Sequence, residues 1–318
     1  MEKANLVYPS GQVTLREVGL RDGLQMVKTF PSTVGKKSWI DVEYAAGIRH
    51  FEVGSFLPKD RYPAFADVEE IIAHVGQLPG AHAAALTPNK KGSQLAMASG
   101  VPEIHCVISA TEEHNLANLD RSRNQTLSEI AQVMALRKES GCDMIIGVGI
   151  AMSFGCSISG EVDPDGVLDL ANQCFELGAD VVSIADTVGF AGPKQVDHLT
   201  KKMRNLSDGK PFGVHLHDTR GMGIANAAAA LDQGVRILDA SMGGLGGCPF
   251  APNATGNIVM EDLVFLCQSG GFETGVDVEK LIEVREILSS EMPDEPLHGA
   301  LAKAGLPISA NLHEQGVQ

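Results

Sequence analysis

The segment Phe212-Gly-Val-His-Leu-His-Asp-Thr-Arg-Gly221 combines a short apolar strand with a polar loop. Residues two apart on a strand point to the same face, so His215 and His217 are expected side by side, about 7 Å apart at the backbone. Two imidazoles placed in this way suit two ligands of one metal ion. A His-x-His pair also occurs on polar edge strands. Here it closes an apolar strand and precedes Asp218 and Arg220, which favours a functional site.

The same succession of strand and loop recurs along the chain. Short segments rich in Val and Ile, mostly apolar on both faces, predict buried parallel strands at 13–19, 50–56, 82–88, 103–109, 144–153, 181–187, 212–218 and 237–244. Periodic segments predict helices at 37–46, 64–74, 92–99, 127–140, 167–177, 194–206, 224–233 and 258–268. This alternation predicts an α/β fold, a closed (β/α)8 TIM barrel. The alternative, an open doubly wound sheet, usually shows Gly-x-Gly-x-x-Gly after its first strand, and Gly19-Leu-Arg-Asp-Gly23 lacks that pattern.

The 318 residues suit one such barrel. One or two further helices are predicted at 276–291, outside the barrel. We therefore expect one domain, 1–292, that comprises the barrel and these appended helices. The Pro- and Gly-containing segment 293–318 is predicted to be a partly ordered C-terminal tail.

Composition narrows the class of protein. The formal net charge of −15 argues against nucleic acid and anionic membranes as partners. The sequence shows neither a run of 18 apolar residues nor an apolar secretory signal, so we expect a cytoplasmic protein without membrane association. Six cysteines without a Cys-x-x-Cys pair predict free thiols: Cys106, Cys142, Cys156, Cys174, Cys248 and Cys267.

Polar side chains are concentrated where the predicted strands end. In a TIM barrel these ends form one rim, which carries the active site. The residues predicted at this rim are Glu17, Arg21, Asp22, Gln25, Glu52, Ser55, Ser109, Thr111, Glu112, Ser183, Asp186, His215, His217, Asp218, Cys248, Asn253 and Asn257.

Four of these residues form a candidate metal site. Asp22, His215, His217 and Asn257 would supply two oxygens and two nitrogens, which suit Mg²⁺ or Mn²⁺, with Zn²⁺ or Co²⁺ as alternatives. Four protein ligands leave two open positions. A substrate hydroxyl near a carboxylate or carbonyl would fill both positions, and the metal would lower the pKa of that hydroxyl.

Two further rim residues are candidates for chemistry. Arg21, next to Asp22, is placed to stabilise developing oxyanion charge, and a salt bridge to Glu52 or Asp186 is compatible with that role. Cys248 lies near the end of the glycine-rich segment Gly243-Gly-Leu-Gly-Gly-Cys-Pro-Phe250. A thiol on a mobile loop can act as a general acid or base, and an inert cysteine in a tight turn is the equal alternative.

Two long segments carry a resemblance to a known family. Val13-Thr-Leu-Arg-Glu-Val-Gly-Leu-Arg-Asp-Gly-Leu-Gln25 and Gly244-Leu-Gly-Gly-Cys-Pro-Phe-Ala-Pro-Asn-Ala-Thr-Gly-Asn257 resemble the 3-hydroxy-3-methylglutaryl-CoA lyase family of metal-dependent barrel lyases. Shorter matches lie at 51–56, 183–189 and 215–221. The resemblance extends from about residue 13 to about residue 276.

The resemblance implies retro-Claisen cleavage of a 3-hydroxy-3-methylglutaryl-CoA-like thioester to acetyl-CoA and a 3-keto acid, acetoacetate in the parent reaction. It also implies a homo-oligomer, a dimer or larger, that acts in leucine catabolism. By this resemblance, Asp22, His215, His217 and Asn257 match the metal ligands. The other implied site residues are catalytic Arg21, Cys248, Asp186, Glu52 and His215, and substrate-binding Gln25, Asn118 and Ser183.

The sequence departs from the family in the stretch expected to contact CoA. Leu116 and Ala117 stand where relatives often have lysine just before the asparagine that Asn118 matches. The CoA phosphates would then need other partners, namely Arg121, Arg123, Lys90 or Lys91. In the glycine-rich loop, Pro252-Asn253 replaces the lysine and glycine of many relatives. Citramalyl-CoA or a longer 3-alkyl-3-hydroxyglutaryl-CoA is therefore an alternative substrate.

Other functions remain open as well. A condensing enzyme of the synthase branch would form the same type of bond, although such enzymes usually carry a C-terminal regulatory domain. A non-catalytic binding barrel would hold no metal. The histidines outside the candidate metal site, His105 among them, are expected to be surface or packed residues, with His114 the exception because it lies in the CoA stretch.

Overall fold

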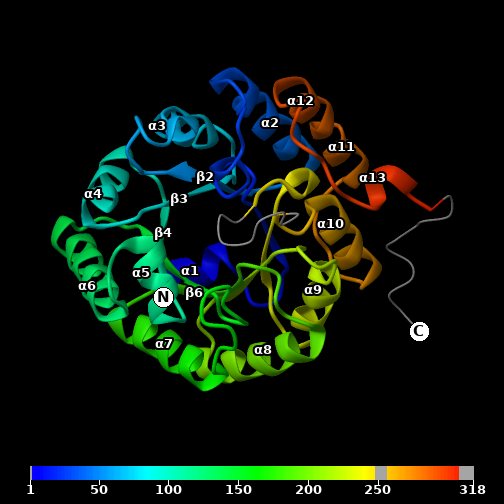
Figure 1. Cartoon of the computed structure of the whole chain (residues 1–318). Helices are drawn as coiled ribbons and strands as arrows, with labels where there is room; N and C mark the ends of the chain where they lie inside the picture. The colour runs from blue at the N-terminus through cyan, green and yellow to red at the C-terminus, as the bar shows by residue number, and fades with distance from the viewer. Residues whose placement is uncertain (1, 248–255, 308–318) are drawn as a thin grey trace.

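The computed structural model describes residues 2–247 and 256–307 (Figure 1). Its parallel strands pair in chain order, and β1 also pairs with β8, so the sheet is a closed barrel. The predicted TIM barrel is confirmed, and the open doubly wound sheet is excluded. The strands are β1 Thr14–Glu17, β2 His50–Ser55, β3 His82–Leu86, β4 Glu103–Ser109, β5 Ile145–Ala151, β6 Val181–Asp186, β7 Phe212–Leu216 and β8 Ile237–Ala240.

Helices surround the barrel in the order in which the sequence predicts them (Figure 1). They are α2 Thr33–Ala46, α3 Val68–Val75, α4 Lys90–Ser99, α6 Arg123–Ser140, α7 Pro164–Leu177, α8 Pro193–Ser207, α9 Gly223–Asp232 and α10 Met260–Ser269. The segment predicted to hold one or two appended helices forms α11 Val278–Ile282 and α12 Val284–Glu291. The sequence did not predict α5 Glu112–Leu119, which follows β4 and precedes α6.

A second unpredicted helix, α1 Glu2–Val7, closes the end of the barrel opposite the strand C-termini (Figure 1). Ala4 and Tyr8 pack against residues at the beginnings of three strands, Ile145, Val181 and Ile237. The Tyr8 hydroxyl also donates a 2.8 Å hydrogen bond to Glu103 Oε2 inside the barrel. Among the described residues, α1 therefore covers this end of the barrel, opposite the rim where polar residues were predicted.

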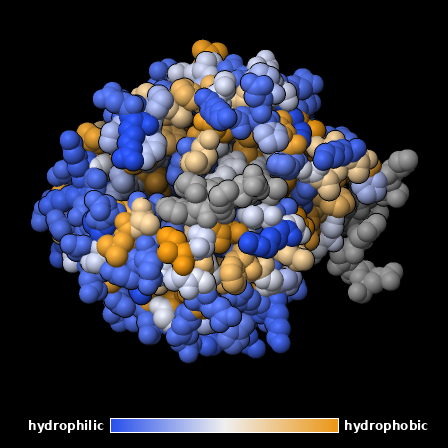
Figure 2. Space-filling view, viewed as in Figure 1, coloured by the Kyte–Doolittle hydropathy of each residue, from blue (hydrophilic) through white to orange (hydrophobic). Residues whose placement is uncertain are grey.

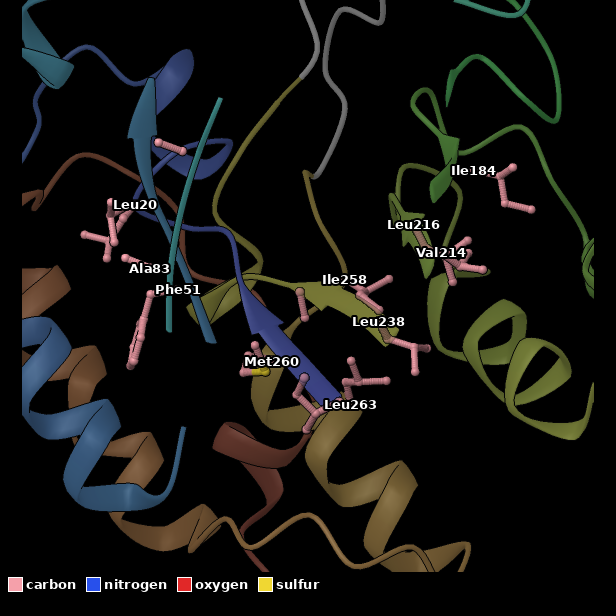
Figure 3. Close-up of a cluster of buried hydrophobic side chains, with 14 of the residues drawn as sticks. Leu20, Phe51, Ala83, Ile184, Val214, Leu216, Leu238, Ile258, Met260 and Leu263 are labelled. Atoms are coloured by element: carbon pink, nitrogen blue, oxygen red, sulfur yellow. The ribbon is translucent and has the colours of Figure 1, made fainter. Parts of the chain in front are cut away.

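Alternation along β7 separates the core from the site. Val214 and Leu216 belong to the large hydrophobic cluster between strands and helices (Figure 3). His215 and His217, one residue out of phase with them, line the cavity inside the barrel. Because successive side chains on a strand point to opposite faces, the apolar face anchors the strand and the other face presents both imidazoles.

The described part of the predicted tail contains α13 Leu301–Ala304. Leu301 is buried, and its backbone N–H donates to Asp262 Oδ1 at 2.8 Å. The boundary at residue 292 stays a prediction, and residues 308–318 lie outside the described residues. Within the described ranges, the cysteines are free thiols and none of the helices is both long and apolar enough to cross a membrane.

Candidate active site

A cavity of about 250 Å³ lies inside the barrel beneath the rim. Most of the residues predicted for the site line it. They come from strands, strand-end loops and helix α5, which lie far apart in the sequence: Arg21, Asp22, Gln25, Glu52, Asn118, Ser183, His215 and His217. Asn257 is buried beside it and forms an isolated bridge with His217. Cys248 and Asn253 lie outside the described residues.

Three of the predicted metal ligands form a compact cluster. One ligand atom each from Asp22, His215 and His217 lies within 4.8 Å of the others. The Nε2 atoms of the two imidazoles are 3.0 Å apart, and His217 Nε2 lies 3.4 Å from Asp22 Oδ2. Although burial raises the pKa of Asp22, Arg21 and the two histidines hold it well below its usual range. The cluster therefore pairs an ionised carboxylate with two imidazole nitrogens.

Asn257 completes the predicted set. Its Nδ2 donates to Asp22 Oδ2 at 2.8 Å and to the Leu245 carbonyl at 2.9 Å, whereas its Oδ1 is buried without a hydrogen-bond partner. A buried carbonyl oxygen without a partner is costly. An oxygen of this kind next to a carboxylate and two imidazoles fits a divalent cation by donor chemistry.

Asp239 of β8 orients one of these imidazoles. Its Oδ2 lies 3.1 Å from His215 Nδ1, and His215 Nε2 faces His217. A carboxylate on the far nitrogen of a histidine fixes the tautomer and the ring plane, an arrangement common around metal sites. Asp239 was absent from the sequence prediction. It occupies the β8 position that pairs with His215 of β7.

Arg21 is held at the cavity wall by two carboxylates. Its Nε donates to Glu52 Oε2 at 2.7 Å, and its Nη1 donates to Asp22 Oδ1 at 2.6 Å. The partner in the predicted salt bridge is therefore Glu52. Asp186, the other candidate, accepts hydrogen bonds from the backbone N–H groups of Phe190 and Ala191 at 2.7 and 3.1 Å, which orders the loop after β6.

Asp22, His215 and His217 are called the metal-type cluster below. Beneath this cluster lies a second layer of charged residues, which the sequence prediction missed. Arg16, His105 and Asp239 line the cavity, and Glu103 is fully buried beneath it. His105, expected to be a surface or packed residue, is partly buried between Glu52 and Glu103 and lines the cavity. A usable sign was present, since each of these residues is a charged or titratable side chain within a predicted strand that is mostly apolar.

Helix α5 forms another part of the cavity wall. His114, Asn118 and Leu119 line the cavity, and the Thr111 hydroxyl caps the helix by accepting from the His114 N–H. His114 Nδ1 lies 2.7 Å from Ser109 Oγ. Of the residues predicted to meet CoA phosphates, Arg121 is half-buried and donates to the Pro88 carbonyl at 2.7 Å.

Comparisons with known proteins agree with this geometry. A family model described as HMGL-like matches residues 12–288. A hydroxymethylglutaryl-CoA lyase of Bacillus subtilis is 33% identical over 90% of this chain and 94% of its own length. An (R)-citramalyl-CoA lyase of Chloroflexus aurantiacus is 35% identical over 92% of this chain and 95% of its own. A solved HMG-CoA lyase from Acinetobacter baumannii, in complex with coenzyme A and 3-methylmalate, superposes with a TM-score of 0.87 at 33% identity and covers 95% of this chain and 97% of that one.

Proposed function

Since this chain belongs to the HMGL-like family and is a carbon–carbon lyase, we propose that it cleaves 3-hydroxy-3-methylglutaryl-CoA to acetyl-CoA and acetoacetate. The observation that carries this proposal is the cluster of Asp22, His215 and His217 in one cavity, with Arg21 ion-paired to Asp22. The reaction needs one group that activates a tertiary hydroxyl and, next to it, a cation that stabilises an enolate. The metal-type cluster would serve the hydroxyl, and Arg21 would serve the enolate.

The proposed reaction is a retro-Claisen cleavage. The tertiary hydroxyl loses its proton, the C2–C3 bond breaks, and C3 becomes the ketone of the keto acid. The electron pair left on C2 forms the enolate of acetyl-CoA, and C2 then takes up a proton. A divalent cation, Mg²⁺ or Mn²⁺, held by Asp22, His215, His217 and Asn257 would lower the hydroxyl pKa and orient the substrate.

Arg21 is proposed to stabilise the enolate. The guanidinium keeps its charge because Glu52 and Asp22, although partly opposed by burial, raise its pKa further above the usual value. Two ion pairs fix its position in advance, so little reorganisation is needed when negative charge develops on the thioester oxygen.

Cys248 is proposed to take part in proton transfer. It lies outside the described residues, but the preceding residue, Gly247, lines the cavity. This supports a role for the next side chain in the reaction.

The CoA portion is proposed to leave the cavity along α5. Asn118 of α5 lines the cavity. The candidate phosphate partners are Arg121 and Arg123, which follow α5 in the chain, and Lys90 and Lys91 at the start of α4. The face around the barrel mouth carries apolar patches between hydrophilic outer helices (Figure 2). The exposed Leu116, Ile158, Phe190 and Met222 belong to segments that follow strand ends and suit contact with a pantetheine chain. We further propose a cytoplasmic homo-oligomer.

Citramalyl-CoA is the second candidate substrate, because a citramalyl-CoA lyase relative matches as much of the chain as the hydroxymethylglutaryl-CoA lyases do. Its acid group is one methylene closer to the carbinol, and cleavage would release pyruvate. Purified protein with Mg²⁺ or Mn²⁺ should be given both thioesters while acetyl-CoA and the keto acid are quantified. Failure to cleave any 3-hydroxyacyl-CoA would overturn the proposed function.

A further inference from the structure

Three charged residues of the lower layer, Arg16, His105 and Glu103, have no role in the proposed reaction as described so far. Arg16 of β1, His105 of β4 and Ser183 of β6 line the same cavity as the metal-type cluster. Asp239 joins the two layers: its Oδ2 lies 3.1 Å from His215 Nδ1, and its Oδ1 accepts from Arg16 Nε at 2.6 Å. The Asp239 carboxylate thus links Arg16 to the cluster where the bond is proposed to break.

Arg16 is buried, with 5% of its side chain exposed, and its terminal nitrogens make only long contacts. Nη2 donates to Ser183 Oγ at 3.4 Å, and Nη1 lies 3.3 Å from His105 Nε2 and 3.8 Å from Glu103 Oε1. Charge-assisted hydrogen bonds of a guanidinium are normally about 2.7–2.9 Å long. Asp239 therefore positions the fork of Arg16 through Nε, while the two outer nitrogens remain able to donate shorter hydrogen bonds to a ligand.

His105 adds positive charge beside Arg16. Its Nδ1 lies 3.0 Å from Glu52 Oε1 and its Nε2 lies 2.7 Å from Glu103 Oε1. Burial lowers the pKa of His105, but these two hydrogen bonds raise it to about 9, so the ring is an imidazolium at neutral pH. Both of its N–H groups are engaged, so it can contribute charge to a ligand but not a hydrogen bond.

Glycines on neighbouring strands give this layer its space. A Cβ on Gly147 of β5 would lie 2.7 Å from His105 Cδ2, and a Cβ on Gly213 of β7 would lie 2.8 Å from Ser183 Oγ. TIM-barrel interiors are ordinarily filled by bulky branched side chains. Here the glycines let a ring and a hydroxyl occupy that volume, and a cavity remains above them.

The side chains at this level favour an anion. The Arg16 guanidinium and the His105 ring lie side by side, with Nη1 3.3 Å from Nε2, and the Ser183 hydroxyl lies 3.4 Å from Arg16 Nη2. The Arg16 fork and the Ser183 O–H are the donors that a carboxylate prefers.

We infer that Arg16 and Ser183, assisted by the charge of His105, bind the free carboxylate at the acyl end of the substrate and make the enzyme selective for acid-bearing 3-hydroxyacyl-CoA thioesters. This inference rests on the proposed function. The carbinol lies at the metal-type cluster, the carboxylate lies at Arg16, and the thioester extends toward α5.

The test compares matched thioesters with and without the carboxylate. 3-Hydroxy-3-methylglutaryl-CoA is compared with 3-hydroxy-3-methylbutanoyl-CoA, which has the same scissile bond and would release acetone. The wild type should favour the acid-bearing substrate by roughly 100-fold or more in kcat/KM. Arg16→Gln should remove most of that preference, because it should lower kcat/KM for the acid-bearing substrate much more than kcat/KM for the neutral one. A purely structural role for Arg16 would lower both rates alike and would overturn the inference.

Arg16→Lys provides a second variant that keeps the charge opposite Asp239 if Arg16→Gln fails to fold. It loses the bidentate fork, so the preference should still fall. Binding is measured separately with glutaryl-CoA and butyryl-CoA, which lack the tertiary hydroxyl and are not cleaved. Tighter wild-type binding of glutaryl-CoA, lost in the Arg16 variants, supports the carboxylate pocket.

The two proposals fail in different ways. If the wild type cleaves the acid-bearing and neutral thioesters equally well, the carboxylate pocket is wrong and the lyase function stands. If the wild type cleaves no thioester but still binds glutaryl-CoA more tightly than butyryl-CoA, the lyase proposal is wrong and the pocket stands.

Discussion

Asp239 Oδ2 lies 3.1 Å from His215 Nδ1, so a carboxylate of β8 fixes a candidate ligand of β7 from its far side. With Nδ1 as the donor, Nε2 keeps its lone pair toward Asp22 and His217. We expect Asp239→Asn to weaken divalent metal binding by about 10–100-fold, the usual effect of removing such a partner. Calorimetric titration of the metal-free protein with Mn²⁺ measures this. Asp165→Asn, in the exposed pair with Lys202, is the control, and equal affinities in both variants would contradict the role.

Replacing a candidate metal ligand should reduce metal binding more than replacing Asp239, which only supports a ligand. Asp22→Ala and His217→Ala should each lower metal affinity and the rate of cleavage together, by roughly 100-fold or more. Even the loss of a residue that only supports a ligand lowers metal affinity or activity by about 10–100-fold. Elemental analysis and acetyl-CoA formation are measured on the same preparations. A variant that loses its metal but keeps its rate would show that the cluster has no part in the reaction.

The thiol of the glycine-rich loop should behave differently. Cys248→Ser is expected to keep its metal and lose about 100-fold or more in kcat, the usual contribution of a general acid or base. Cys142→Ser, at a half-buried cysteine after α6, provides the matched control. An unchanged rate in Cys248→Ser would leave the thiol as an inert residue in a turn.

His105 should make stability depend on pH in the alkaline range. Its pKa is raised to about 9, against about 6.5 in an unfolded chain. A raised histidine pKa stabilises the fold fully below pH 6.5, and this contribution is lost as the pH rises through 9. The loss amounts to about 3 kcal/mol. Denaturant unfolding at pH 6 and pH 10 should show this loss of unfolding free energy in the wild type but not in His105→Gln. Equal losses in both proteins would mean that another group causes the pH dependence.

A buried acidic cluster outside the barrel should also lose stability as the pH rises, but in a lower pH range. Glu17, Glu43 and Glu261 are fully buried, and burial raises the pKa of Glu43 and brings that of Glu17 to about 8. Stability is therefore lost as the pH rises from the ordinary glutamate range to about 8. Glu43→Gln should be more stable than the wild type at pH 8 by about 1–4 kcal/mol. Chemical unfolding at pH 8 and pH 5 tests this, since the difference in unfolding free energy between Glu43→Gln and the wild type should be smaller at pH 5.

The sequence by itself determined the barrel and most of the metal-type cluster. Alternating apolar strands and periodic helices predicted the closed sheet, and strand ends that share one rim predicted that Asp22 would meet the imidazoles of β7. Local chemistry is sufficient for these predictions: a two-residue spacing places His215 and His217 on one face, and chain neighbours place Arg21 beside Asp22.

Only the tertiary structure decided the layer below. Arg16, His105 and Asp239 lie on β1, β4 and β8, and a charged residue within an apolar strand does not reveal which distant strand carries its partner. Barrel closure sets the stagger between strands, and that stagger brings Asp239 between Arg16 and His215. The helix that closes the barrel floor, α1, was likewise hidden, because its burial depends on strand ends far along the chain.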